Sequence, residues 1–158
     1  ETRKKVEKIY FEKLDSKHSY QGNNKAESMD FLPIKTSPHK YTLVLDLDET
    51  LIHYVEEDNN AFIQIRPYAE EFVEAMASLF EIVIFTAAMK DYADFVLDRF
   101  DVNKRISYRL YREHTQQVEK VNIKNLNRLG RNIKTTLIID NVEANFKLNP
   151  DNGYHIRN

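Results

Sequence analysis

Two acidic side chains, two residues apart, are the feature of this sequence that most clearly suggests chemistry. Asp46 and Asp48 stand at the end of an apolar run that begins at residue 41. Carboxylates this close repel each other, so one of them tends toward protonation unless a cation joins the pair. A hard divalent cation with oxygen ligands, most simply Mg²⁺, meets that need. An Asp carboxylate held in this way can attack phosphorus, and its neighbour can transfer the proton of the leaving group.

Two later apolar runs also end in polar residues that the same chemistry could use. Thr86 offers a hydroxyl and a backbone N–H to a phosphoryl oxygen, and Asp140 with Asn141 adds further oxygen ligands. A cation must still balance the phosphoryl charge, and a Lys on a short helix after residue 120 could supply it. Periodicity alone leaves Lys120 and Lys124 as open alternatives.

The elements that would position these residues alternate between strands and helices. Three runs, 41–46, 82–86 and 136–140, are apolar without alternation, which indicates strands buried on both faces of a parallel sheet. Amphipathic patterns between the runs predict helices, so the expected fold is α/β with helices on both faces of the sheet. Ligands of such sheets bind beyond the carboxyl ends of the strands, where the three polar strand ends would converge.

Shorter patterns predict the remaining elements. A helix is expected to begin at Pro67 and to bury side chains as far as Phe80, and a second helix is expected at 90–100. Smaller expected elements are an N-terminal helix at 4–14, a loop at 15–30, a hairpin at 55–65, an outer strand at 106–111 and a helical turn at 126–129 capped by Gly130. The aromatic side chains expected in the core are Phe72, Phe80, Phe95 and Phe100.

Composition excludes several other classes of protein. The 158 residues include no Cys, which excludes a disulfide scaffold, a thiolate zinc site and a Cys nucleophile. No apolar run approaches the roughly 20 residues that span a bilayer, so no transmembrane segment is expected. Residues 46–101 carry fourteen acidic and three basic side chains, which argues against contact between this part and a nucleic-acid backbone.

Together, these residues resemble a known family. The segments 46–51, 85–87 and 139–141 resemble the motifs of the haloacid dehalogenase superfamily. The closer similarity is to its branch of small C-terminal-domain phosphatases (FCP/SCP-type), which dephosphorylate Ser or Thr in proteins. Further segments typical of this branch are Arg66-Pro67, Tyr92-Ala93-Asp94, Arg109-Leu110-Tyr111-Arg112-Glu113, Leu129-Gly130-Arg131 and Pro150-Asp151-Asn152-Gly153. The resemblance covers residues 41–158 and implies a Rossmann-like parallel sheet flanked by helices, with a small hairpin insertion and no large cap.

The resemblance implies roles for the residues that contact the phosphoryl group. Asp46 would be the nucleophile and a Mg²⁺ ligand. Asp48 would be the general acid/base, and its backbone carbonyl would also bind the metal. Thr86 would bind the phosphoryl group. Arg112 would help to place the substrate phosphate, with a surface ion pair to Glu113 as the alternative.

The resemblance also implies roles for the basic and amide side chains. Residues 122–126 match the Lys-bearing motif of the family, which selects Lys124 over Lys120 as the catalytic and substrate-binding cation. Asn141 would complete the metal shell. Asp140 would orient Lys124 and a water at the metal.

The implied function is a Mg²⁺-dependent protein serine/threonine phosphatase that forms an aspartyl-phosphate, with a phosphoserine or phosphothreonine protein as its substrate. The alternative is a structural or adaptor subunit of a larger assembly that retains the phosphatase fold, as in a mitochondrial translocase. The expected location is intracellular, in the nucleus or cytoplasm, with the mitochondrion as an alternative. A small-metabolite phosphatase would need a larger cap than residues 51–66 can form.

Three regions lie outside the usual pattern of the family. Residues 1–40 are expected to be an accessory segment, separate from the phosphatase-like domain at 41–158. The insertion at 54–65 is shorter than usual, so its part in peptide selection is open. The family continues into a Trp-containing turn and a final helix, so we expect the domain to extend beyond residue 158.

Overall fold

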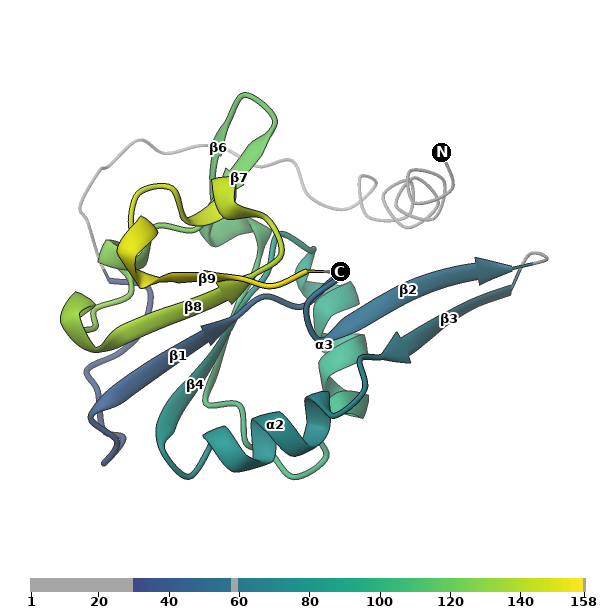
Figure 1. The fold of residues 1–158 in the computed structure, drawn as a ribbon, viewed down its shortest axis with the longest axis horizontal. Helices are drawn as coiled ribbons and strands as arrows, with labels where there is room; N and C mark the ends of the chain where they lie inside the picture. Colours follow the sequence, from purple (N-terminus) through teal and green to yellow (C-terminus); the bar gives the residue numbers. More distant parts are fainter. Residues whose placement is uncertain (1–29, 58–59, 158) are drawn as a thin grey trace.

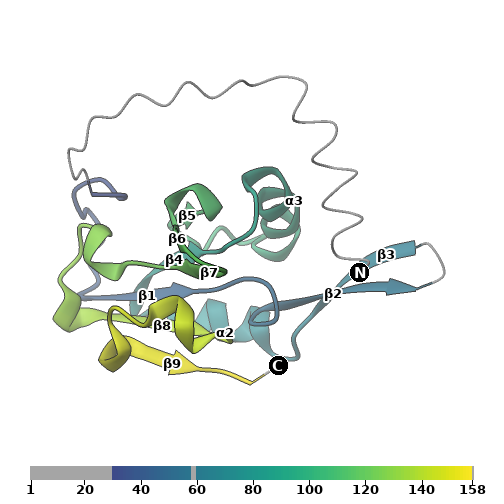
Figure 2. The ribbon, with the colours of Figure 1, turned by 90° about the horizontal axis from the view of Figure 1, so that it is seen from above.

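A five-stranded parallel sheet forms the centre of the computed structural model, which describes residues 30–57 and 60–157. The strands are ordered β5-β4-β1-β8-β9, and each neighbouring pair runs parallel (Figures 1 and 2). They are β1 (Tyr41–Leu45), β4 (Phe80–Phe85), β5 (Tyr108–Leu110), β8 (Thr136–Asp140) and β9 (Gly153–His155). The expected N-terminal helix at 4–14, and the loop after it up to residue 29, lie outside the described residues.

The three predicted strands are present and occupy the centre of this sheet. In β1 and β4, nearly all side chains are buried, as continuous apolar runs require in a strand covered on both faces. The predicted outer strand is also confirmed, because β5 pairs only with β4 among the described residues. The parallel α/β fold with flanking helices is therefore as the sequence indicates.

Within the described part of the chain, two α-helices connect the strands, α2 (Ala69–Met76) and α3 (Lys90–Phe100). The prediction for α3 is confirmed, whereas α2 is shorter than expected. The hydroxyl of Ser78 donates to the carbonyl of Ala75 at the end of α2. Leu79 then lies in the following turn and is 58% exposed, and Phe80 begins β4 rather than ending the helix.

The prediction for the four core aromatic residues is wrong for Phe95. Phe100 is buried, and Phe72 and Phe80 pack partly buried against the core, but Phe95 is 51% exposed on α3. The guanidinium of Arg99, one helical turn later, lies 3.7 Å from the centre of the Phe95 ring. A cation over the ring face makes an exposed aromatic side chain tolerable on a solvent-facing helix surface.

Each face of the sheet has its own buried cluster. Side chains of both α2 and α3 belong to the cluster that includes Leu43, Leu45 and Ile84. The opposite face, which carries Val44 and Phe85, is covered by short 3-10 helices and by the segment before β1. The 3-10 helices are η1 (Arg112–His114), η2 (Leu126–Arg128), η3 (Ile133–Thr135), η4 (Glu143–Phe146) and η5 (Pro150–Asn152). Gly130 follows η2 with φ 70°, in the left-handed region that suits a glycine cap, as predicted.

Two hairpins project from the sheet. The hairpin β2 (Ile52–Glu57) and β3 (Asn60–Ile65) extends well away from the sheet in both views (Figures 1 and 2). It begins earlier than the predicted 55–65, and no larger cap is inserted between β1 and α2. The second hairpin, β6 (Gln116–Val118) and β7 (Val121–Ile123), is not anticipated by the sequence analysis. Within the described residues, no helix is long and apolar enough to cross a membrane.

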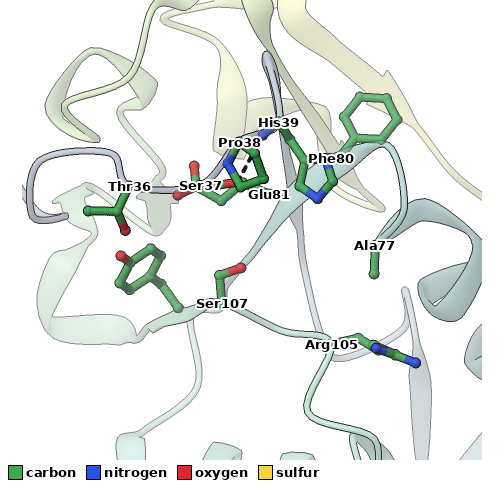
Figure 3. Close-up of a pocket in the computed structure, with 10 residues that line it drawn as sticks. Thr36, Ser37, Pro38, His39, Ala77, Phe80, Glu81, Arg105 and Ser107 are labelled. Atoms are coloured by element: carbon green, nitrogen blue, oxygen red, sulfur yellow. Dashed lines mark hydrogen bonds between the residues drawn. The ribbon is translucent and has the colours of Figure 1, made fainter.

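A hollow of about 350 Å³ opens at the amino ends of β4 and β5 (Figure 3). It is lined by Thr36, Ser37, Pro38, His39, Ala77, Phe80, Glu81, Arg105, Ser107 and Tyr108. The predicted site residues lie at the opposite, carboxyl edge of the sheet. This hollow is therefore separate from the candidate active site.

Candidate active site

Asp46 directly follows β1 and is buried at the carboxyl edge of the sheet. Its backbone N–H donates to the carbonyl of Ile139 at 3.0 Å, so the pairing with β8 continues past the end of the strand. Its side chain is held on both oxygens. Oδ1 accepts from Lys124 Nζ at 2.6 Å, and Oδ2 accepts from the hydroxyl of Thr50 at 3.1 Å. The carboxylate thus has a fixed orientation.

Lys124 is fully buried between two carboxylates. Its ammonium group lies 2.6 Å from Asp46 Oδ1 and 2.6 Å from Asp140 Oδ2. It arrives at the end of strand β7, not on a helix as expected, and its backbone N–H donates to the carbonyl of Asn145. Lys120 lies exposed in the turn between β6 and β7. The structure therefore brings Lys124, and not Lys120, into contact with the acidic residues.

Asp140 ends β8 and is completely buried. Besides Lys124, its carboxylate accepts from the backbone N–H of Val142 at 2.8 Å and from the side-chain amide of Asn145 at 3.1 Å. These donors fix the carboxylate against Lys124. Asn145 is not among the predicted site residues, and its only sequence signal is an amide side chain five residues after the strand-end Asp.

The charges of the site are unbalanced. Burial, together with the nearby carboxyl groups of Asp140 and Asp48, raises the pKa of the Asp46 carboxyl from its ordinary 3.8 to about 6, although Lys124 opposes the rise. Burial disfavours a charged Lys124, but the carboxylates of Asp46 and Asp140 together hold its pKa above the ordinary value of 10.5. The carboxyl groups of Asp46 and Asp140 share a single ammonium group, so the site has a deficit of positive charge.

Asp48 lies in a tight turn after β1. The turn includes Glu49 with φ 61°, and the backbone N–H groups of Thr50 and Leu51 both donate to the carbonyl of Leu47. Arg66, which directly follows β3, clamps this turn, because its guanidinium donates to the carbonyls of Thr50 at 2.6 Å and Glu49 at 2.9 Å. Arg66 stands in the sequence within a segment typical of the family, but no sequence pattern predicts this clamping role.

Thr86 and Arg112 each hydrogen-bond to the loop that follows β4. The Thr86 hydroxyl accepts from the backbone N–H of Ala88 at 3.0 Å, so its own hydrogen remains a donor. The expectation that its backbone N–H also binds a phosphoryl oxygen is wrong, because that N–H donates to the carbonyl of Leu110 at 2.9 Å. Arg112 Nε donates to the carbonyl of Ala87 at 2.6 Å, so Arg112 braces this loop from the neighbouring segment.

The oxygen atoms at the carboxyl edge of the sheet suit a hard divalent cation as ligands. The residues expected to hold Mg²⁺ are Asp46 by its carboxylate, Asp48 by its backbone carbonyl and Asn141, which directly follows β8. All three offer oxygen, and the excess of negative charge favours a cation. Among residues 30–57 and 60–157, no three His, Cys, Asp or Glu side chains gather as a metal site. The expected Mg²⁺ ligands are one carboxylate, one backbone carbonyl and one side-chain amide, so they do not include three such side chains.

The fold and this arrangement of residues define a class of protein. The family model for NLI interacting factor-like phosphatases matches residues 41–158, so the chain belongs to that family. The fold is similar to that of the fission yeast RNA polymerase II CTD phosphatase Fcp1 bound to beryllium fluoride, with a TM-score of 0.63 and 21% identity. That match covers 74% of this chain and 41% of the yeast chain, and it supports the haloacid-dehalogenase-like fold.

Several curated proteins are similar to the chain. A probable C-terminal domain small phosphatase of Dictyostelium discoideum is 40% identical over 131 residues, which cover 73% of this chain and 43% of that protein. CTD small phosphatase-like protein 3 of Caenorhabditis elegans is 41% identical over 143 residues, covering 79% and 50%. The human carboxy-terminal domain RNA polymerase II polypeptide A small phosphatase 2 is 37% identical over 131 residues, covering 73% and 48%. The chain thus spans half or less of the length of these relatives.

Proposed function

We propose that the chain is a Mg²⁺-dependent protein serine/threonine phosphatase that acts through an aspartyl-phosphate on Asp46. The observation that carries the proposal is the fixed triad of Asp46, Lys124 and Asp140, at 2.6 Å on each side of the ammonium. The family and its named phosphatase relatives support a phosphatase. The alternative role as a scaffold subunit is not favoured by these relatives.

The chemistry divides into two steps. In the first, a carboxylate oxygen of Asp46 attacks phosphorus while the bond between phosphorus and the Ser or Thr oxygen breaks. Asp48 gives its proton to that leaving oxygen. In the second, Asp48 takes a proton from a water molecule as the water oxygen attacks phosphorus and releases Asp46.

The other residues bind charge and maintain geometry. Lys124 is oriented by Asp140 and supplies positive charge next to the attacking carboxylate. Thr86 donates its hydroxyl hydrogen to a phosphoryl oxygen, and Arg112 helps to place the substrate phosphate. A bound Mg²⁺, held by Asp46, Asp48 and Asn141, would neutralise charge on the phosphoryl group.

The open site suits a phosphate carried on a protein. Among the described residues, the hairpin β2–β3 is the sole insertion between β1 and α2, and it is too small to enclose a metabolite. We therefore propose phosphoserine and phosphothreonine in exposed protein segments as the substrate class. The relatives named for the RNA polymerase II C-terminal domain make such a segment one candidate substrate.

The test is phosphate release from a phosphoserine peptide in the presence of Mg²⁺. We expect Asp46→Asn to lower turnover by at least roughly a thousandfold, because the covalent path loses its nucleophile. A matched control is Glu74→Gln, which removes an exposed carboxylate paired with Arg105 and should leave turnover unchanged. Chelation should abolish turnover, and added Mg²⁺ should restore it. Equal turnover of the wild type and Asp46→Asn would overturn the proposal.

A further inference from the structure

The segment Tyr92-Ala93-Asp94 at the start of α3 reaches the active site. The hydroxyl of Tyr92 donates to Asp48 Oδ1 at 2.8 Å, although 44 residues separate the two in the sequence. Tyr92 is partly buried and packs against the core cluster that also includes Leu47. The contact therefore joins the first turn of a helix to the side chain expected to transfer protons.

Asp94 fixes the same helical turn to the neighbouring strand. Its Oδ1 accepts from the hydroxyl of Tyr111 at 2.7 Å and from Arg109 at 2.9 Å, while its Oδ2 pairs with Lys90. Burial opposes ionisation of Asp94, but its hydrogen bonds to Lys90, Tyr111 and Arg109 hold its pKa below the ordinary value. A charged carboxylate with this many donors has little freedom to move.

Ala93, between these two residues, is completely buried in the core cluster. Its backbone N–H donates to the carbonyl of Met89 at 3.0 Å, in the first turn of the helix. A small side chain here allows close approach of α3 to the sheet. The three successive residues therefore have distinct parts: Asp94 anchors the turn, Ala93 permits its packing, and Tyr92 extends to Asp48.

We propose that Tyr92 is a positioning residue that holds the carboxyl group of Asp48 toward the leaving group. This inference rests on the proposed phosphatase function. A general acid must stay within hydrogen-bond reach of the atom that it protonates. A hydrogen bond from the phenol to one oxygen restricts rotation of the carboxyl group, and α3 itself is fixed through Asp94.

In the step that breaks the bond to the leaving group, one proton moves from Asp48 to the leaving oxygen. As the bond between phosphorus and the leaving oxygen breaks, its electron pair stays on that oxygen, and the proton of Asp48 moves there. The phenol of Tyr92 keeps its own proton. It continues to donate to the newly formed carboxylate, and a hydrogen bond to a charged acceptor is stronger than one to a neutral acceptor.

The dependence of the reaction on the leaving group tests this assignment. The substrates are aryl phosphates that share the phenyl phosphate scaffold and whose para substituents change chiefly the basicity of the leaving oxygen. A strongly basic leaving oxygen needs a proton, whereas p-nitrophenolate leaves without one. We expect Tyr92→Phe to lower kcat/KM about tenfold for phenyl phosphate and less than about twofold for p-nitrophenyl phosphate.

Tyr111→Phe is the matched control, because it removes a phenol hydroxyl that donates to Asp94 and not to Asp48. It should affect both substrates by the same factor, and thermal unfolding should show that both variants fold. A crystal structure of Tyr92→Phe should show the Asp48 side chain in more than one orientation.

Two results would overturn the inference alone: an equal effect of Tyr92→Phe on all phenyl phosphates, or an effect confined to peptide substrates. Turnover by Asp46→Asn equal to that of the wild type would instead overturn the proposed function.

Discussion

Two buried charge clusters lie at opposite edges of the same sheet, and they are built differently. The site cluster at the carboxyl edge consists of Asp46, Lys124 and Asp140. The base cluster at the amino edge consists of Glu81, Arg131 and Thr42. In both, an ionised side chain is almost completely removed from solvent, which is costly unless the charge is paired and hydrogen-bonded.

The base cluster is satisfied internally. Arg131 holds Glu81 through two hydrogen bonds of 2.7 and 2.9 Å, and the hydroxyl of Thr42 adds a third at 3.0 Å. Arg131 also donates to the carbonyl of Pro33, which ties the segment before β1 to the sheet. Burial opposes ionisation of Glu81, but these donors and Lys35 hold its pKa below the ordinary value of 4.5.

The site cluster has the opposite character. There, burial and neighbouring carboxylates raise the pKa of Asp46 to about 6 in spite of Lys124. Acidic residues outnumber basic ones, whereas the base cluster pairs its single carboxylate with a full guanidinium. The base cluster therefore needs no further charge, whereas the excess of negative charge in the site cluster favours a ligand that brings positive charge, such as the proposed Mg²⁺.

The largest expected effect is at the single cation of the site cluster. Lys124→Met leaves the buried carboxylates of Asp46 and Asp140 without a counter-charge, so we expect the free energy of unfolding to fall by about 3 to 5 kcal/mol. Urea denaturation in the presence of a chelator measures this, so that no cation replaces the ammonium. Lys120→Met, at the exposed turn, is the control and should change stability by less than about 0.5 kcal/mol. Similar stability of the two variants would mean that Lys124 does not balance the site.

A smaller effect is expected at the base cluster. Glu81→Gln keeps the shape of the side chain but leaves the buried guanidinium of Arg131 without its counter-charge, so we expect a loss of about 2 to 3 kcal/mol at pH 7. The kcat/KM of the folded variant should equal that of the wild type, because the base cluster lies far from the carboxyl edge. A large loss of activity without loss of stability would contradict the division into two roles.

The wild type and Glu81→Gln also test how the free energy of unfolding depends on pH. Because the folded-state pKa of Glu81 lies below 4.5, its contribution to stability is fully present above pH 4.5. It is lost as the pH falls through the folded-state pKa, where Glu81 becomes protonated. The stability difference between the wild type and Glu81→Gln should therefore shrink on acidification below that value. A difference that stays constant from pH 7 to strongly acidic pH would show that the charge of Glu81 is unimportant.

The sequence could predict the strand-end residues of the site but not the tertiary contacts around them. Asp46, Thr86 and Asp140 each stand at or just after the end of an apolar run, and the parallel sheet brings those ends to one edge. Lys124 could be chosen only by family resemblance, because it arrives on the unanticipated hairpin β6–β7. Its burial depends on contacts across 78 residues, which no local pattern encodes.

One backbone contact and one side-chain contact explain two further differences. The backbone N–H of Thr86 is used by Leu110 because β5 pairs beside β4, and this pairing is not visible in the motif itself. The exposure of Phe95 likewise depends on Arg99, since an aromatic side chain fits helical periodicity whether it faces the core or a cation. Local sequence patterns therefore predict the helices and strands well, but they predict poorly which residues contact one another.

The smallest expected effect separates charge from burial within the base cluster. Lys35 lies 3.9 Å from Glu81 Oε2 and its side chain is 24% exposed, so solvent screens the attraction. We expect Lys35→Ala to lower the free energy of unfolding by less than about 1 kcal/mol, although Lys35 and Lys124 each approach a buried carboxylate. Urea denaturation at low and high salt measures the effect, which should become smaller in high salt. The contrary result would be a loss of unfolding free energy as large as that of Lys124→Met. It would show that proximity to a buried carboxylate determines the energy of both ion pairs, and that burial of the ammonium group does not.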